Sequence, residues 1–293
     1  MGRAAEIPNV SGMTNDALLP AAELSTARRR LRSFRVPVLI VAMAAVLVIT
    51  RLLNMAVEDV PILALLMGLG TAAAAIACYA WLSRKVEART SITELPRAGR
   101  WSSLVKGFGL GFAAFTVGIT LIGILGGWSV GWGSFGALVG GFGAMASVAV
   151  NEELLFRGVV FRILSERANI VVAFVLSCLI FGFAHAVNAN ASLLGLLSIA
   201  IQGGSLMASA YLASRSLWLP IAIHCAWDVA EGNFFGVQNS GTEQTGLLHT
   251  VLTGPDWLTG GSFGPEASPV TWVVCLSLSA VLLLRARRNR AQA

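Results

Sequence analysis

Long apolar segments alternate with short polar segments along most of this chain. A helix needs roughly 17–25 predominantly apolar residues to cross a bilayer, and several of the apolar segments are that long. They occupy residues 36–57, 60–82, 107–126, 135–157, 170–186, 192–213, 217–236 and 269–285. The pattern therefore predicts an all-α fold, a polytopic bundle of about eight transmembrane helices.

The polar segments divide the chain into a bundle and two tails. Residues 1–27 show no helical or strand periodicity and five arginines follow by residue 35, which predicts a disordered basic cytoplasmic tail over residues 1–35. Residues 36–286 form the predicted bundle, in which about 237–268 make a long outer loop rich in turn-forming residues. Residues 287–293 are predicted to be a basic C-terminal tail.

Composition supports a membrane protein. Hydrophobic residues make up 56% of the chain and charged residues only 12%, whereas a soluble domain carries roughly 25% charged residues. An ordinary soluble domain is thereby excluded. We expect a multi-pass protein of the cell (plasma) membrane.

The net charge of +6 does not indicate nucleic-acid binding, because the basic residues flank predicted spans. They gather before the first span, in the linker 84–106 and after the last span. Basic residues concentrate on the cytoplasmic side of membrane proteins. With an even number of spans, both termini are then predicted to be cytoplasmic. The expected partner is the lipid bilayer, and no nucleic acid is expected.

Glycine and cysteine indicate packing rather than chemistry. Gly107 with Gly111, and Gly136 with Gly140, fit small-residue faces that let transmembrane helices approach closely. All four cysteines lie inside apolar segments without a C-x-x-C pair, so we interpret them as small buried hydrophobic residues.

A few ionisable residues interrupt the apolar segments. Such groups are costly inside a bilayer and usually functional. They are Glu152, Glu153, Arg157, His185, His224, Asp228 and, near the end of its segment, Glu231. No charged residue lies between Lys106 and Glu152, so the two glutamates stand out sharply.

Helical spacing separates the two neighbouring glutamates. Glu153 and Arg157 are four residues apart and share a face, where they can form an ion pair. Glu152 lies about 100° around the helix and faces a different neighbour. His224 and Asp228 also share one face, with the same spacing. Phe181 lies one turn before His185 and should pack beneath it.

This set of residues allows two kinds of chemistry. A glutamate in a site with little water can act as a general base on water, assisted by a histidine, while a second polar pair stabilises an oxyanion. Glu152, His185 and His224 can instead hold a zinc ion, since His and Glu are common zinc ligands. A purely structural role for the Glu153–Arg157 pair, or for either histidine alone, is the competing interpretation.

Three motifs in order, each in its own predicted span, resemble the CAAX-protease and bacteriocin-processing (CPBP, or Abi) family of intramembrane proteases. E-E-x-x-x-R is formed by Glu152, Glu153 and Arg157 and is followed by Gly158; F-x-x-x-H is formed by Phe181 and His185; and H-x-x-x-N/D is formed by His224 and Asp228. The resemblance covers about residues 100–236, which would be the catalytic core.

The resemblance implies an intramembrane endopeptidase that is CAAX prenyl protease 2-like, either of the glutamic type or a metalloendopeptidase. By analogy Glu152 would be the general base, and His185 would share its water. His224 and Asp228 would form the oxyanion side, while Glu153, Arg157 and Phe181 would be supporting residues. We favour a reaction without a metal or cofactor. The expected partner is a membrane-embedded protein or peptide substrate.

Two features disagree with the simplest version of this hypothesis. An ionised Asp228 cannot donate a hydrogen bond to an oxyanion, so it must be protonated or must orient His224. The depths also differ: Glu152 is roughly 15 Å from Arg162, whereas His185 is roughly 24 Å from Asn169 at 1.5 Å per residue. An error in the predicted boundaries would explain this mismatch.

The alternative is a non-catalytic membrane protein, such as a proton-coupled transporter or a peptide-sequestering immunity protein. Transporters use buried Glu and His side chains as proton relays. Internal repeats are common in transporters but are not found in this sequence. The two hypotheses differ in geometry, because catalysis requires Glu152, His185 and His224 to converge around one small site.

Overall fold

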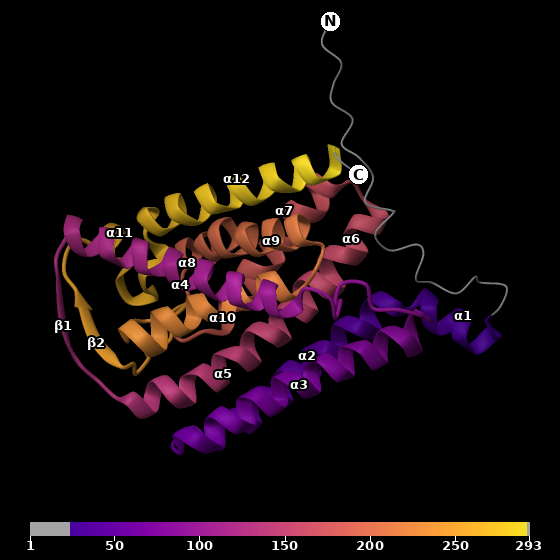
Figure 1. The fold of residues 1–293 in the computed structure, drawn as a ribbon, viewed down its shortest axis with the longest axis horizontal. Helices are drawn as coiled ribbons and strands as arrows, with labels where there is room; N and C mark the ends of the chain where they lie inside the picture. Colours follow the sequence, from indigo (N-terminus) through magenta and orange to yellow (C-terminus); the bar gives the residue numbers. More distant parts are fainter. Residues whose placement is uncertain (1–23, 292–293) are drawn as a thin grey trace, which may run out of the picture.

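The computed structural model describes residues 24–291, and their fold is a bundle of long helices lying roughly side by side (Figure 1). The principal helices are α2 (Arg35–Met55), α3 (Pro61–Val86), α4 (Arg100–Leu125), α5 (Phe135–Glu153), α7 (Ile170–Ala184), α8 (Leu193–Ile199), α9 (Ser205–Ser214), α10 (Trp218–Asp228) and α12 (Pro269–Ala291). The prediction of an all-α polytopic bundle is confirmed.

Seven helical segments in the described part of the chain are long and apolar enough to span a membrane. They are Arg35–Met55, Pro61–Val86, Arg100–Leu125, Phe135–Arg167, Ile170–Val187, Leu193–Ser214 and Pro269–Arg288. By this criterion of length and composition, seven of the eight predicted spans qualify. The segment 217–236 is helical, as α10 and the π-helix η7 (Val229–Phe235), but it is too polar to qualify.

The position of α10 explains how it can carry polar residues. From Pro220 to Asp228 every residue of this helix is buried, because α4, α5 and α9 surround it. A helix enclosed by other helices is shielded from lipid. Its polar side chains can therefore find polar partners inside the bundle, which lowers their cost.

Close contacts at glycine bring α4 against α10. A Cβ atom on Gly111 would lie 2.2 Å from the carbonyl oxygen of Ile223, and one on Gly107 would lie 2.7 Å from Cβ of Ala222. The predicted small-residue face at these positions thus forms a helix contact. A similar face on α5 contacts α3, where Gly140 lies against Pro61 and Ala64.

The helices are not the whole fold, because the segment between α4 and α5 pairs with part of the predicted outer loop 237–268 as a small sheet. β1 (Trp128–Trp132) and β2 (Leu248–Leu252) are antiparallel, with Trp128 opposite Leu252 and Trp132 opposite Leu248. The sheet lies at one end of the bundle (Figure 1). Beyond β2 the loop forms the short helix α11 (Asp256–Thr259) and two 3₁₀ turns, η8 (Gly261–Phe263) and η9 (Pro265–Ala267).

A network of ion pairs between arginines and glutamates lies at the opposite end of the bundle. Arg162 bonds Glu87 at 2.7 Å and Glu166 at 3.0 Å, and Arg35 pairs with the same two glutamates. The N-terminal end of α2 and the C-terminal end of α12 both lie at this end of the bundle (Figure 1). This arrangement is compatible with both termini on one side of a membrane.

The predicted tails are partly helical. Residues 1–23 of the predicted N-terminal tail lie outside the described residues, but Thr26–Ser33 forms α1 and α2 already begins at Arg35. At the other end α12 continues to Ala291, through most of the predicted C-terminal tail. Both stretches are rich in Arg, which is among the stronger helix formers.

Candidate active site

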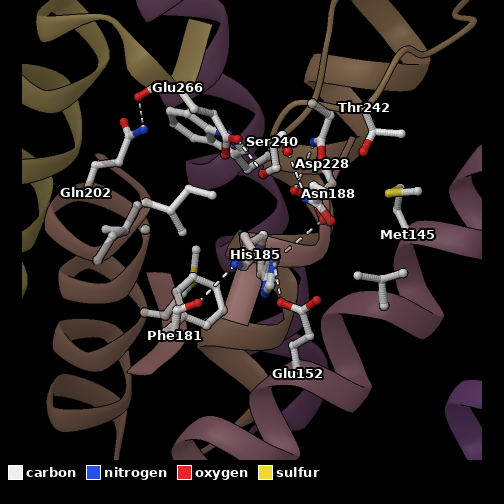
Figure 2. A pocket seen from close by; sticks show the side chains of 18 of the residues that line it. Met145, Glu152, Phe181, His185, Asn188, Gln202, Asp228, Ser240, Thr242 and Glu266 are labelled. Carbon is white, nitrogen blue, oxygen red and sulfur yellow. Dashed lines mark hydrogen bonds and ion pairs between the residues drawn. The ribbon is translucent and has the colours of Figure 1, made fainter. Parts of the chain in front are cut away.

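The predicted catalytic residues line one cavity of about 100 Å³ inside the bundle (Figure 2). Glu152 comes from α5, and His185 begins the 3₁₀ turn η5 (His185–Val187) at the end of α7. His224 and Asp228 come from α10. Phe181 also lines the cavity. The convergence that catalysis requires is therefore present.

A π-helical stretch interrupts three of the helices that build this site. η4 (Leu154–Phe161) follows Glu153, η7 follows Asp228, and η6 (Ala200–Gly204) begins one residue after Ile199 at the cavity wall. π-helical turns occur frequently at functional sites because they rotate side chains relative to a regular helix. In this site, η4 and η7 each follow directly after a carboxylate, Glu153 and Asp228 respectively.

Glu152 is the carboxylate that faces the cavity. Its Oε2 atom lies 3.9 Å from Nε2 of His224 and has no hydrogen-bond partner among the described residues. The Oδ2 atom of Asp228 lies 3.5 Å from the same Nε2 atom. The carboxylates of Glu152 and Asp228 therefore both approach Nε2 of His224. The Oε2 atom of Glu152 remains able to accept a hydrogen bond.

Glu153 points the other way, into a fully buried cluster. Its Oε1 atom accepts a hydrogen bond from Arg157 at 2.8 Å, which is the expected ion pair, and contacts Nδ1 of His224 at 3.0 Å. Arg157 also donates to the carbonyl oxygen of Gly204 at 3.0 Å, and its guanidinium lies 4.3 Å from the centre of the Phe181 ring. The contact between Glu153 and His224 was not predicted.

The hydrogen bond of His185 fixes its tautomer. Nδ1 lies 3.0 Å from the carbonyl oxygen of Phe181, which can only accept, so Nδ1 carries the proton. In the neutral ring Nε2 is then an acceptor. The Phe181 ring lies edge-on to both histidines, with centroid distances of 5.1 Å to His185 and 5.8 Å to His224.

The depth mismatch comes from an incorrect helix boundary. The helix that carries Glu152 continues unbroken from Phe135 to Arg167, past the predicted end at residue 157. Measured from Arg167, Glu152 is roughly 22 Å along the helix, and His185 is roughly 22 Å from Ile170. The two residues therefore lie at similar depths.

Sequence reasoning missed the contribution of the loop after η7. Asn239 donates to Asp228 at 3.3 Å and to Glu231 at 3.2 Å, while Ser240 donates to Glu266. Asn188, which follows η5, donates to the carbonyl oxygen of Ser240 at 2.7 Å. The only available signal was an abundance of polar residues in an outer loop, which is also typical of solvated loops.

The geometry for zinc is not met by the candidate ligands. In the described part of the chain, no group of three or more His, Cys, Asp or Glu side chains is arranged to hold a metal ion. Nδ1 of both histidines is engaged, by Phe181 and by Glu153, which leaves Nε2 as the ring nitrogen that can contact a ligand in the cavity.

Seven apolar helices in the described part of the chain, with a carboxylate–histidine cavity inside the bundle, define a multi-pass membrane protein. Residues 134–230 match the family described as Type II CAAX prenyl endopeptidase Rce1-like. These residues belong to the CAAX protease family, as their motifs indicated, and the family implies a protease. No curated protein and no solved structure matches the chain.

Proposed function

We propose that the protein is an intramembrane endopeptidase of the glutamic type, which cleaves membrane-associated proteins or peptides with water activated by Glu152. The observation that carries this proposal is the position of Glu152. It is the one carboxylate of the adjacent pair that faces the cavity, and it does so opposite two histidines from other helices.

Glu152 acts as the general base. It takes a proton from a water molecule held between its carboxylate and Nε2 of His185, and the hydroxide attacks the carbonyl carbon of the substrate. The protonated Glu152 then gives this proton to the departing amide nitrogen, and the carbon–nitrogen bond breaks. One water is consumed, and the products are a carboxylate and an amine.

His224 stabilises the oxyanion. Glu153 holds Nδ1, so Nε2 is the ring nitrogen that faces the cavity. A doubly protonated ring donates its Nε2 hydrogen to the tetrahedral oxyanion. Asp228 lies beside Nε2 and accepts from Asn239, so its role is to orient and neutralise the ring rather than to donate.

A cleavage assay tests this proposal. The protein and its Glu152→Gln, His185→Ala and His224→Ala variants are reconstituted in nanodiscs with a quenched fluorescent transmembrane peptide. All three variants should lose turnover. Substantial activity in Glu152→Gln would overturn the mechanism, and absence of turnover in the wild type across a peptide library would favour the transporter or immunity alternative.

A chelator in the same assay tests the metal-free reaction. Turnover should persist in excess EDTA or phenanthroline because no step uses a metal. Loss of activity that zinc restores would instead establish a metalloendopeptidase. We also propose that the protein lies in the plasma membrane with both termini in the cytoplasm, which accessibility labelling of tagged termini checks.

A further inference from the structure

A second, larger cavity adjoins the catalytic one. It measures about 600 Å³ and lies between α2, α3, α5 and the loop 242–245. Glu152, Arg51, Met145, Val148 and Thr242 line both cavities, so the larger one leads to the candidate base. We call it the lateral groove. No step of the mechanism described above uses it.

Several amide side chains in the groove wall have an oxygen atom that accepts no hydrogen bond from the described residues. Asn151 is 1% exposed and Asn233 is 5% exposed, and the Oδ1 atom of each has no partner among the described residues. The Oδ1 atom of Asn54 is also unpartnered. Their amide nitrogens are partly engaged: Asn54 donates to Thr71 and Ser147, and Asn151 donates to the carbonyl oxygen of Ser147.

Unpaired carbonyl oxygens in a buried wall favour a ligand that brings N–H groups. A buried acceptor without a donor has lost its hydration without gaining a hydrogen bond, so native structures normally satisfy it. The backbone of an extended peptide supplies one N–H group per residue. The wall therefore suits a peptide segment better than an acyl chain, which has no donor.

Acidic residues distinguish the end of the groove nearest the sheet. Three exposed acidic residues line the lateral groove but not the catalytic cavity. They are Glu58 and Asp59, in the turn between α2 and α3, and Glu243, in the loop after η7. Figure 1 shows that this turn lies at the sheet end of the bundle, away from the arginine-rich end. The single basic residue among the described lining residues is Arg51, which also lines the catalytic cavity.

We propose that the lateral groove binds the substrate as an extended peptide segment and selects segments with a lysine or arginine beside the apolar part. The amide oxygens accept hydrogen bonds from the substrate backbone, and Glu58, Asp59 and Glu243 attract its basic side chain. This inference rests on the proposed endopeptidase function. It adds a substrate class, a membrane peptide with a basic flank.

Two synthetic peptides test the charge preference. They share one quenched fluorescent apolar segment and differ only in three flanking residues, which are lysines in one peptide and glutamates in the other. The wild type should show a KM at least tenfold lower for the lysine peptide, with similar kcat. Raising the salt concentration from 0.05 to 0.5 M should shrink the difference, because exposed charges are screened.

Charge-reversal variants locate the effect. Glu58→Lys combined with Glu243→Lys should reverse the preference towards the glutamate peptide. Asp256→Lys is the matched control, since Asp256 is exposed but does not line the groove. Equal KM values in the wild type, or an equal shift in the control, would overturn the assignment of charge selection to the groove.

The backbone contacts have a separate test. Asn151→Leu keeps the side-chain size and removes the free acceptor, so the KM for both peptides should rise severalfold while kcat and the charge preference remain. An unchanged KM would refute the role of this amide.

Binding to the Glu152→Gln variant separates failure of the groove from failure of the proposed function. Anisotropy of labelled peptides reports binding without turnover, and the lysine peptide should bind at least tenfold more tightly. Selective binding without any cleavage by the wild type would overturn the proposed endopeptidase function and support peptide binding in the lateral groove. Cleavage with equal binding of the two peptides would support the endopeptidase function and overturn charge selection by the groove.

Discussion

Glu153 holds His224 through its Oε1 atom, which lies 3.0 Å from Nδ1 of the histidine. The same oxygen accepts from Arg157 at 2.8 Å. Glu153 therefore does more than pair with Arg157. Its contact with Nδ1 also fixes the direction in which Nε2 of His224 faces. Two adjacent glutamates thus have different structural roles, and their substitution should have different consequences.

Replacing Glu152 should abolish catalysis without unfolding the protein. Its Oε2 atom has no hydrogen-bond partner among the described residues, so Glu152→Gln removes little structural interaction. A general base contributes roughly 10²–10⁴-fold to rate, and kcat should fall by that factor. The thermal midpoint in detergent should remain within about 2 °C of wild type, which corresponds to a stability change of about 1 kcal/mol or less in a large chain. A large drop in this midpoint would show a structural role instead.

Replacing Glu153 should destabilise the protein. Glu153→Leu leaves Arg157 buried without its counter-ion, and breaking such a pair costs about 3–5 kcal/mol. The double variant Glu153→Leu with Arg157→Met removes both charges and should recover part of this loss. The free energy of unfolding is measured by titration with SDS. Equal stability of the single and double variants would contradict the ion-pair argument.

The role of Asp228 predicts a graded response to substitution. Asp228→Asn keeps a polar group beside His224, whose orientation still depends on Glu153, so kcat should stay within about tenfold of wild type. Asp228→Leu removes the polar group beside Nε2 of His224 and places an apolar side chain there, and it should lower kcat by about 10²-fold or more. Loss of activity in Asp228→Asn as complete as in Asp228→Leu would show that the carboxylate itself is required.

Much of this site could be predicted from the sequence, because charged residues are rare in the apolar segments. Spacing alone separated Glu152 from Glu153 and paired Glu153 with Arg157. The contact between Glu153 and His224 could not be predicted, since it depends on how closely α10 approaches α5. Nor could Asn239 be identified, because its contacts depend on how the long loop folds back over the bundle.

The sequence predicted the apolar helices of the fold better than it predicted the buried helix 217–236 and the small sheet. Hydropathy located the lipid-facing helices well, since their apolar length is set by the bilayer. Segment 217–236 is helical as predicted but falls below the apolar criterion for a span, because burial among other helices replaces lipid contact there. The pairing of β1 with β2 joins residues more than a hundred positions apart, and neither strand shows a strong local signal.

The linker between α3 and α4 should confer acid-sensitive stability. Arg89 holds the carboxylate of Glu94 through two hydrogen bonds of 2.5 Å. Burial alone would raise the pKa of Glu94, but hydrogen bonding and the positive charge of Arg89 and Arg162 outweigh it, so the pKa is lowered.

A lowered pKa in the folded protein means that the carboxylate stabilises the fold above its unfolded pKa of about 4.3, and that this contribution is lost as pH falls through the lower folded value. Glu94→Gln should therefore be less stable than wild type at pH 7, and this difference should begin to shrink as the pH falls below about 4. Thermal melting across pH 3–8 measures this. A constant difference over that range would contradict the linkage.

Close packing of α4 against α10 should make Gly111 far less tolerant of substitution than its neighbour Gly109. A Cβ at Gly111 would lie 2.2 Å from the carbonyl oxygen of Ile223, and backbone cannot move aside as a flexible side chain can. Gly111→Ala should therefore lower the free energy of unfolding by about 1–3 kcal/mol. It should also lower kcat, because Ile223 immediately precedes His224. Gly109→Ala meets no atom within 4 Å and should leave both quantities unchanged or raise stability slightly. Unfolding in SDS and peptide cleavage, measured on both variants together, check this prediction, and equal tolerance at the two positions would contradict the packing that places His224 in the site.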